Sequence, residues 1–224
     1  SPGAPGCRSS RPGAAEVSEK EELERVVPVI EAIMRRFPDA VVSVDTWRAA
    51  VAAAAVAAGA AIVNDISAGR LDARLYATTA GLRVPYILMH MQGAPGTMQQ
   101  NPQYDDVVTE VLDFFIREVE KLRALGVTDI VLDPGFGFGK TVEHNFRLLK
   151  NLHVFGNVTG LPVLAGISRK SMICKVLKVT PDKALNATTA LHMVALQQGA
   201  RIPRAHDVRE ATEVIRLWEQ LEVV

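Results

Sequence analysis

Short apolar runs alternate with longer amphipathic segments along most of this chain, and a polar residue closes nearly every run. The runs have the length of buried strands, whereas apolar residues in the segments between them recur at helical spacing. The runs lie at 40–44, 61–63, 85–90, 128–133, 162–167 and 200–204. The pattern therefore predicts six strand-helix units.

The first helix is predicted to begin at Ser18, because Ser18 and Glu21 have the spacing of a capping box. Its predicted buried face consists of Leu23, Val26, Val27, Ile30, Ile33 and Met34. The long run 49–63 is mostly alanine and is shorter than the roughly 18 to 20 residues that span a bilayer, so we interpret it as helix followed by strand. Residues 1–17 are expected to be irregular, and 18–224 to form one α/β domain.

Apolar strands separated by helices indicate a parallel sheet that is covered on both faces. An open doubly wound sheet and an eight-stranded TIM barrel both fit this pattern. The polar residues at or just after the strand ends are Asp45, Asn64, Asp65, His90, Asp133, Ser168, Arg169, Lys170, Arg204 and His206. Since nearly every strand contributes, the distribution favours the barrel, which gathers ligands from its whole carboxyl rim.

Composition and charge favour a small-molecule partner. The 224 residues are 48% hydrophobic, enough for one large core, and 25 basic residues balance 25 acidic ones. No net field therefore attracts nucleic acid or an anionic membrane. Cys7 and Cys174 form no CxxC pair, and the five histidines show no metal-ligand spacing, so we expect reduced thiols, a cytoplasmic location and no tightly held transition metal.

The glycine-rich segment 133–141 follows a strand but does not have P-loop spacing. A P-loop needs glycine where Pro134 stands, and a dinucleotide fingerprint needs glycine where Lys140 stands. The glycines remain positions where backbone could approach a flat ligand closely, although a simple turn also explains them.

Two kinds of ligand chemistry are indicated at the strand ends. Asp133 and Asn64 could recognise a heterocycle, although Asn64 with Asp65 would also suit a turn or a helix cap. Ser168, Arg169 and Lys170, with Arg204 and His206, could seat a diphosphate, although pairing with nearby carboxylates is the structural alternative. Met89 could wall a flat ring but is more typical of packing.

Seven ordered motifs give the chain a specific resemblance. They are Ser9 to Ala14, Ser43 to Thr46, Val63 to Ser67, Met89 to Met91, Asp133 to Lys140, Gly166 to Lys170 and Arg204 to Val208. In order and spacing, they resemble the dihydropteroate synthases, which are pterin-binding TIM-barrel enzymes. The resemblance implies a transferase of folate biosynthesis that condenses dihydropterin-6-ylmethyl diphosphate with p-aminobenzoate, releases diphosphate, and is the target of sulfonamides.

The resemblance also implies residue roles. The pterin site would be Asp45, Asn64, Met89, Asp133 and Lys170. The diphosphate site would be Ser10, Arg11, Asn64, Arg204 and His206. The p-aminobenzoate pocket would be Ser10, Arg11, Pro12, Gly137, Phe138, Ser168 and Lys170. The catalytic set would be Asp45, Lys170, Arg204 and His206.

Three features depart from this family pattern. The family's first strand with its magnesium-binding loop is not recognisable, so Mg²⁺ is implied but no protein ligand for it is identified. The end of the family's second strand is likewise not recognisable in Pro5 to Arg8. Pro203 would remove a ladder hydrogen bond from its strand. We therefore expect an open barrel segment of six strands, irregular residues before Val17, and low synthase activity.

The resemblance further implies a homodimer, and two alternative functions stay open. One is a pterin-binding relative with impaired catalysis. The other is a methyltetrahydrofolate-binding domain of a methyltransferase, which has no need of the cations at the strand ends.

Overall fold

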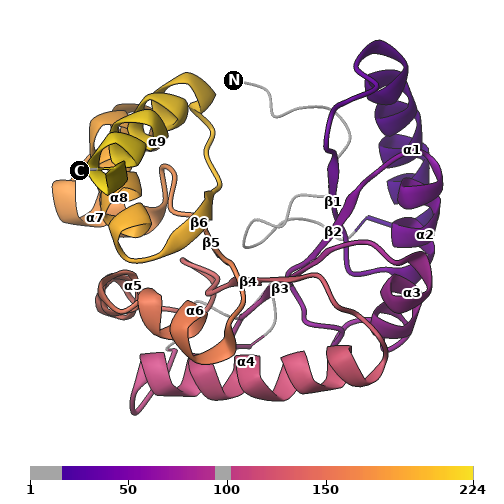
Figure 1. The fold of residues 1–224 in the computed structure, drawn as a ribbon, viewed down its shortest axis with the longest axis horizontal. Helices are drawn as coiled ribbons and strands as arrows, with labels where there is room; N and C mark the ends of the chain where they lie inside the picture. The colour runs from indigo at the N-terminus through magenta and orange to yellow at the C-terminus, as the bar shows by residue number, and fades with distance from the viewer. Residues whose placement is uncertain (1–16, 94–101, 224) are drawn as a thin grey trace. The chain divides into compact units, whose positions relative to one another are not determined.

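A computed structural model describes residues 17–93 and 102–223 of the chain (Figure 1). The chain divides into two compact units, of which the first is Ser1–Met89 with Arg117–Val131 and the second is His90–Ile116 with Leu132–Val224. Helix α4 (Val107–Ala124) and strand β4 (Ile130–Asp133) each contribute residues to both units. The units are described in turn.

The first unit contains three parallel strands whose order in the sheet is their order in the sequence. They are β1 (Ser43–Asp45), β2 (Ile62–Asp65) and β3 (Tyr86–Met89). Three helices, α1 (Glu19–Arg36), α2 (Ala49–Ala57) and α3 (Leu75–Leu82), lie side by side on one face of these strands (Figure 1). Val44, Val63 and Leu88 are buried, as expected for strands that are covered by helices.

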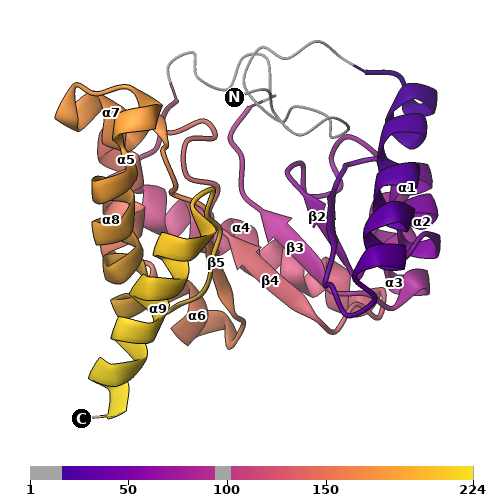
Figure 2. The same ribbon diagram turned by 90° about the horizontal axis from the view of Figure 1, so that it is seen from above.

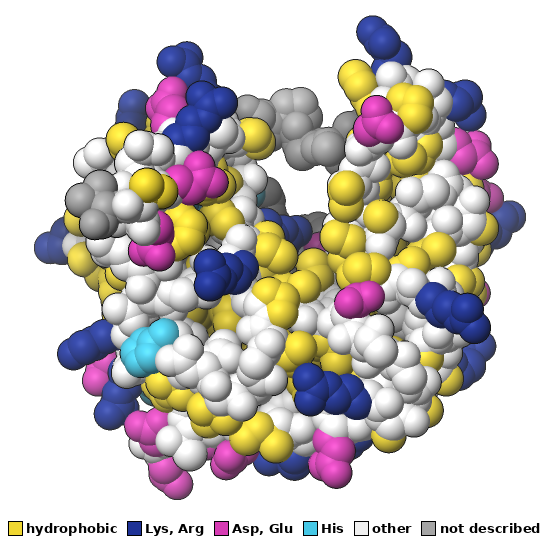
Figure 3. Space-filling view, viewed as in Figure 1, with side chains coloured by type: hydrophobic (Ala, Val, Ile, Leu, Met, Phe, Trp, Pro, Cys, Tyr) yellow, Lys and Arg dark blue, Asp and Glu magenta, His cyan; other side chains and the backbone are white. Residues whose placement is uncertain are grey.

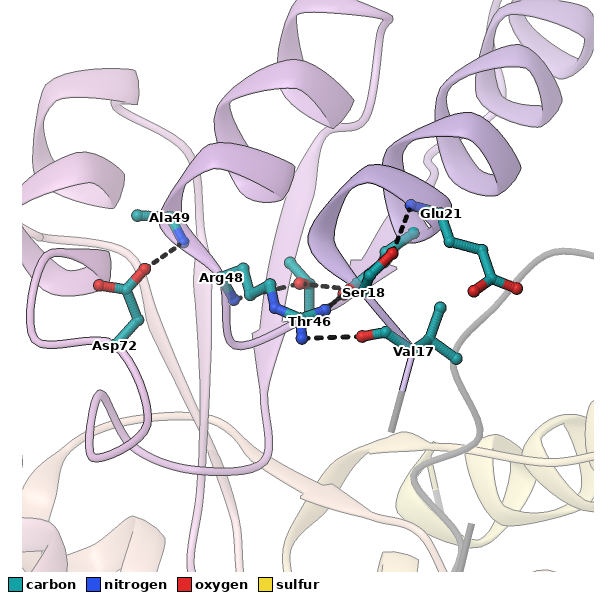
Figure 4. Close-up of polar contacts among 8 residues, drawn as sticks. Val17, Ser18, Glu21, Thr46, Arg48, Ala49 and Asp72 are labelled. Carbon is teal, nitrogen blue, oxygen red and sulfur yellow. Dashed lines mark hydrogen bonds and ion pairs between the residues drawn. The ribbon is translucent and has the colours of Figure 1, made fainter. Parts of the chain in front are cut away.

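Helix α1 begins as predicted, with one difference on its buried face. The Ser18 hydroxyl accepts from the Glu21 N–H at 3.2 Å, which is the N-terminal half of a capping box (Figure 4). Val26 and Ile30 are buried, whereas the other four predicted positions are half-buried. The fully buried position that the prediction missed is Glu22, which is 1% exposed.

Glu22 binds the end of β1. One carboxylate oxygen of Glu22 accepts from the Thr46 hydroxyl at 2.7 Å, and the other accepts from the Arg48 guanidinium. Arg48 also donates to the Val17 carbonyl at 2.8 Å (Figure 4). The segment that follows Asp45 is therefore fixed to the beginning of α1 by paired, buried groups, which is the condition under which a buried carboxylate is tolerated.

The second unit continues the same alternation. Its strands β4, β5 (Val163–Ala165) and β6 (Ala200–Pro203) are parallel and again follow sequence order. Its helices are α5 (Val142–Lys150), α6 (His153–Thr159), α7 (Ser171–Leu177), the short 3-10 turn η1 (Pro181–Lys183), α8 (Leu185–Gln197) and α9 (Val208–Val223). Helices α8 and α9 pack against each other (Figure 2).

Pro203 is accommodated by an irregularity in the pairing of β6. Val163 pairs with Ala200 but Leu164 pairs with Ile202, so Arg201 is an extra residue on β6. The N–H of Arg204 donates to the Ala165 carbonyl at 3.0 Å, just after the position where proline has no donor. The backbone at Arg204 therefore remains tied to β5, although Pro203 lies in the strand.

The six predicted strand-helix units are all present, but the strands are shorter than their apolar runs. The first strand begins at Ser43 instead of residue 40, and the fifth ends at Ala165 instead of residue 167. Ile167 lies past the end of β5 and is buried, whereas Val41 lies before β1 and is 74% exposed, so an apolar run predicts a strand without locating its ends. Among the strands of residues 17–93 and 102–223, neither unit shows the reversal of strand order that creates the switch point of a doubly wound sheet.

The surface agrees with the balanced composition. On the face shown in Figure 3, basic and acidic side chains are interspersed around each unit, and neither sign forms a broad patch. Within residues 17–93 and 102–223, no helix combines the length and apolar character needed to cross a membrane.

Candidate active site

Asp133 is a buried carboxylate at the last position of β4. It is 4% exposed, and one of its oxygens accepts from the Gly135 N–H at 2.8 Å. Burial raises the pKa of Asp133 above its ordinary value, while Lys170, the Gly135 N–H and Arg204 act in the opposite direction. The other oxygen is a suitable acceptor for a ligand N–H.

Lys170 immediately precedes α7 and directs its ammonium to the β4–α5 loop. Its Nζ donates to the Phe136 carbonyl and lies 4.9 Å from the centroid of the Phe138 ring. Burial lowers the pKa of Lys170 to about 8; Asp133 opposes this shift and Arg204 adds to it. The second unit thus brings Asp133, Phe138 and Lys170 together, as the sequence predicted.

The β4–α5 loop is held by a second lysine, whose role the sequence did not reveal. Lys140 is 3% exposed, and its Nζ donates to the carbonyls of Gly135 at 3.0 Å, Phe138 at 2.9 Å and His90 at 3.3 Å. An ammonium that is engaged by backbone carbonyls inside a loop is not a phosphate ligand. This agrees with the spacing argument against a P-loop.

Two glycines allow this loop its shape. A Cβ at Gly139 would lie 2.4 Å from the backbone oxygen of Gln92, and one at Gly137 would lie 3.5 Å from Cδ of Lys170. Both residues have left-handed φ angles, +62° and +82°. The close approaches that were expected toward a ligand are therefore made, in part, to the protein itself.

Ser168 and His206 meet at the ends of β5 and β6. The Ser168 hydroxyl lies 3.2 Å from the backbone N–H of His206 and 3.0 Å from its Nδ1. Ser168 is buried, whereas His206 is exposed, so an imidazole stands beside a fixed hydroxyl, and the exposed Arg204 lies two residues before His206. This arrangement suits an anion with several oxygens.

Arg169 does not belong to that set, which corrects the interpretation of Ser168, Arg169 and Lys170 as one anion seat. The Arg169 guanidinium forms a two-pronged ion pair with Asp207, at 2.8 and 2.5 Å. The structural alternative, pairing with a nearby carboxylate, is therefore the correct one for Arg169.

In the first unit, Asp45 at the end of β1 pairs with Asn64, the last residue but one of β2, and their side chains contact each other. Asn64 Nδ2 donates to Asp45 Oδ1 at 2.9 Å. Asn64 is 6% exposed, and its buried Oδ1 has no hydrogen-bond partner among the described residues. A buried acceptor of this kind requires an explanation, and a ligand N–H is one that fits.

Asp65, the neighbour of Asn64, has a structural role. Its two oxygens accept from Ser67 N–H and Oγ, both at 2.7 Å, from Gly69 N–H at 2.6 Å and from Tyr86 O–H at 2.6 Å. Burial raises the pKa of Tyr86 well above its ordinary value, so Tyr86 stays a donor. Helix α3 begins only at Leu75, so the helix-cap alternative is wrong and the turn alternative is right for Asp65.

Replacing Asp65 by Asn should lower the free energy of unfolding by roughly 2 to 3 kcal/mol, since an amide nitrogen would face donors in a buried site. Chemical denaturation measures this, with Asp39→Asn at an exposed position as the control. Tyr86→Phe, which removes one of the four donors, should cost about 1 kcal/mol. A loss no larger for Asp65→Asn than for Asp39→Asn would contradict the turn role.

The remaining predicted residues are less informative. Met89 is 2% exposed at the end of β3, and its role toward a pterin stays a prediction. Ser10, Arg11 and Pro12 lie outside the described residues, as does the segment that was expected to be irregular before Val17.

The burial of Glu22 was missed but could have been found from the sequence, because Glu22 lies one helical turn before Val26 on the buried face of α1.

Relatives of known identity place the chain in a family. A family model described as pterin binding enzyme matches residues 6–206. The dihydropteroate synthase of Escherichia coli K12 is 47% identical over 220 residues, which cover 96% of this chain and 76% of the relative. The chain belongs to the dihydropteroate synthase family. The family's synthase from Haemophilus influenzae is 44% identical over 216 residues, covering 96% of this chain and 78% of the relative.

Solved structures of the family have the same fold. The Yersinia pestis dihydropteroate synthase, in a sulfonamide drug complex, matches with a TM-score of 0.93 at 44% identity, over 97% of this chain and 78% of that one. The Xanthomonas albilineans enzyme with 4-aminobenzoic acid matches with a TM-score of 0.90 at 40% identity, over 98% of this chain and 78% of that one. The predicted α/β-barrel class with six strand-helix units is thus confirmed.

Proposed function

We propose that this protein is a dihydropteroate synthase, which joins the amine of p-aminobenzoate to the methylene carbon of dihydropterin-6-ylmethyl diphosphate and releases diphosphate. The observation that carries the proposal is the grouping, in the second unit, of buried Asp133 with Lys170, beside the Ser168–His206 contact. Asp133 and Lys170 suit a heterocycle with N–H donors, and Ser168 and His206 suit an oxygen-rich anion.

Asp133 would accept from pterin N–H groups, and the Lys170 ammonium would donate to a pterin acceptor. The assignment of Asp45, Asn64 and Met89 to the pterin rests on the resemblance. It is supported by the buried Asn64 Oδ1, which has no protein donor among the described residues. Asp45 would act by orienting the Asn64 amide through the contact at 2.9 Å.

Arg204 and His206 would bind the diphosphate, together with Asn64, Ser10 and Arg11 as the resemblance implies. As the diphosphate leaves, positive charge develops on the methylene carbon and negative charge on the departing oxygens. A carboxylate near the ring and cations at the leaving group therefore both bind more strongly in the transition state. The p-aminobenzoate pocket would be formed by Gly137, Phe138, Ser168 and Lys170, with Ser10, Arg11 and Pro12.

Magnesium fits this proposal only as a companion of the substrate. Across the part of the chain that the structure describes, no cluster of three or more His, Cys, Asp or Glu side chains could hold a metal ion. Mg²⁺ commonly binds through substrate phosphates and retains several waters. We propose that it enters with the diphosphate; titrating diphosphate inhibition with and without Mg²⁺ tests this.

The decisive assay supplies the dihydropterin diphosphate and p-aminobenzoate and measures released diphosphate together with dihydropteroate. Product formation supports the synthase. Pterin binding without product would support the impaired relative. Pterin binding that inorganic diphosphate does not inhibit would favour the methyltetrahydrofolate-binding alternative. A sulfonamide should compete with p-aminobenzoate, as expected from the drug complex of the Yersinia pestis relative.

Arg204→Lys should weaken inhibition by diphosphate about tenfold and change bare pterin binding little. Lysine keeps the charge but loses the planar fork that binds two oxygens. Inhibition constants and pterin dissociation constants measure the two effects, with Arg201→Lys, at an exposed position of β6, as the control. Equal losses for both ligands would indicate a structural role for Arg204.

The homodimer and the cytoplasmic location are also proposals. Leu217 and Leu221 lie four residues apart on α9 and are 63% and 61% exposed, so this helix presents an apolar stripe that suits a second copy. Light scattering tests the dimer, and Leu217→Glu should favour the monomer. Cell fractionation tests the location.

A further inference from the structure

Arg169 connects the two loops that carry the predicted diphosphate ligands. It lies in the β5–α7 loop between Ser168 and Lys170, whereas its partner Asp207 directly follows His206 in the β6–α9 loop. Arg169 Nε and Nη2 donate to the two oxygens of Asp207 at 2.8 and 2.5 Å. This parallel geometry fixes both the distance and the orientation of the two loops.

Arg169 is itself anchored on neighbouring elements. Its backbone N–H donates to Thr188 Oγ1 on α8 at 3.1 Å, and its Nη1 donates to the Pro181 carbonyl at 3.2 Å. The pair is also shielded, since the side chains of Arg169 and Asp207 are only 26% and 18% exposed. A two-pronged, partly buried pair is less screened than a single contact at the surface.

The backbone at Arg169 has a conformation that residues other than glycine adopt rarely. Its φ is +52°, a left-handed conformation that glycine or asparagine adopts more readily than arginine. Arg83 and Lys178 also have positive φ angles, but they end α3 and α7, where that conformation is common. Arg169 is held in this conformation inside a site loop, which is typical of functional positions.

The pair remains ionised around neutrality. The hydrogen bonds from Arg169 are the main reason why the pKa of Asp207 is lowered, and the same contact raises the pKa of Arg169. The guanidinium charge is therefore balanced within the protein. Arg169 is therefore not assigned to an incoming anion; under the proposed function, that role belongs to Arg204 and His206.

We infer that Arg169 and Asp207 form a positioning pair that holds Arg204 and His206 in the geometry required for the diphosphate leaving group. The inference rests on the proposed synthase function. Without the pair, Arg204 N–H still donates to the Ala165 carbonyl, but the rest of the β6–α9 loop, beyond Arg204, can shift. The contact from Ser168 to His206 is then lost, whereas Asp133 keeps its contact with Gly135 in another loop.

The test replaces Arg169 with Asn, which removes the guanidinium but tolerates the left-handed backbone. Arg83→Asn is the matched control, because Arg83 has nearly the same φ, +55°, at the exposed end of α3. Inhibition by inorganic diphosphate should weaken roughly tenfold in Arg169→Asn, as for other residues that orient ligand-binding groups. Binding of a bare pterin should change less than about twofold in both variants.

Charge reversal gives the second arm. Arg169→Asp and Asp207→Arg should each weaken diphosphate inhibition, and the double variant should recover most of the loss, because the pair is restored with opposite polarity. If Arg169→Asn does not fold, Arg169→Lys carries the test. Lysine keeps the positive charge but lacks the two-pronged guanidinium, so diphosphate inhibition should weaken by an intermediate amount.

The outcomes separate the two claims. A wild-type protein that forms dihydropteroate, together with an Arg169→Asn variant of unchanged diphosphate inhibition, overturns the positioning pair alone. Equal losses of pterin and diphosphate binding, or no recovery in the double variant, also overturn it. A wild-type protein that binds pterin but neither forms product nor responds to diphosphate overturns the proposed function first.

Discussion

Asp133→Asn should weaken pterin binding roughly ten- to a hundredfold while the protein stays folded. The substituted amide nitrogen would either face a pterin N–H or lose the acceptor for Gly135, and a mismatched buried polar group costs about 1 to 3 kcal/mol. Isothermal titration with a bare pterin measures the loss, and circular dichroism confirms the fold.

Asp129→Asn is the matched control, because Asp129 lies just before β4 and its side chain is exposed. Its pterin affinity should equal that of the wild type. Unchanged affinity in a folded Asp133→Asn variant would remove Asp133 from the site, and the pterin assignment of the second unit would then rest on Lys170 alone.

Lys170→Met should reduce synthase turnover by about two orders of magnitude and remove a pH dependence that the wild type shows. A charged group that contacts substrate contributes about 1.5 to 3 kcal/mol. The Lys170 pKa is lowered to about 8, so only about a tenth of the ammonium remains at pH 9. Wild-type affinity for the dihydropterin diphosphate should therefore fall about tenfold between pH 7 and pH 9.

The pH dependence of folding stability at Lys170 runs in the opposite direction to the pH dependence of substrate binding. Between pH 8 and the ordinary lysine pKa of 10.5, the unfolded chain binds more protons at this position than the folded chain does. The contribution of Lys170 to folding stability therefore becomes more favourable as the pH rises through that window. Lys175→Met, within α7, is the control, and this variant should keep the tenfold fall in substrate affinity between pH 7 and pH 9. If Lys170→Met still shows the fall in affinity between pH 7 and pH 9, another titrating group causes it.

The sequence predicted the order of the elements and the strand-end residues because both follow from short-range rules. A strand that ends in a parallel sheet places its next polar residue at the carboxyl edge, so Asn64 and Asp133 could be located without coordinates. The exact strand ends could not be located, since buried apolar residues such as Ile167 continue past the last paired residue.

Residue partners could not be predicted, because they depend on contacts between distant segments. Arg169 and Lys170 are adjacent cations in the sequence, yet one binds Asp207 and the other binds the Phe136 carbonyl. The spacing excluded Lys140 as a P-loop lysine, but it did not predict the three carbonyls to which Lys140 donates. The burial of Glu22 follows from its place on the helix, but its partners Thr46 and Arg48 lie in another element and could not be predicted.

The two contacts from His206 to Ser168 fix the direction in which its imidazole ring points. Ser168 Oγ accepts from the His206 backbone N–H at 3.2 Å and lies 3.0 Å from Nδ1, so the backbone and one ring nitrogen are held by the same oxygen. A hydroxyl has one hydrogen and two lone pairs, so it can hold Nδ1 in either tautomer of the ring. The other ring nitrogen, Nε2, is therefore the one that an incoming phosphate oxygen would meet.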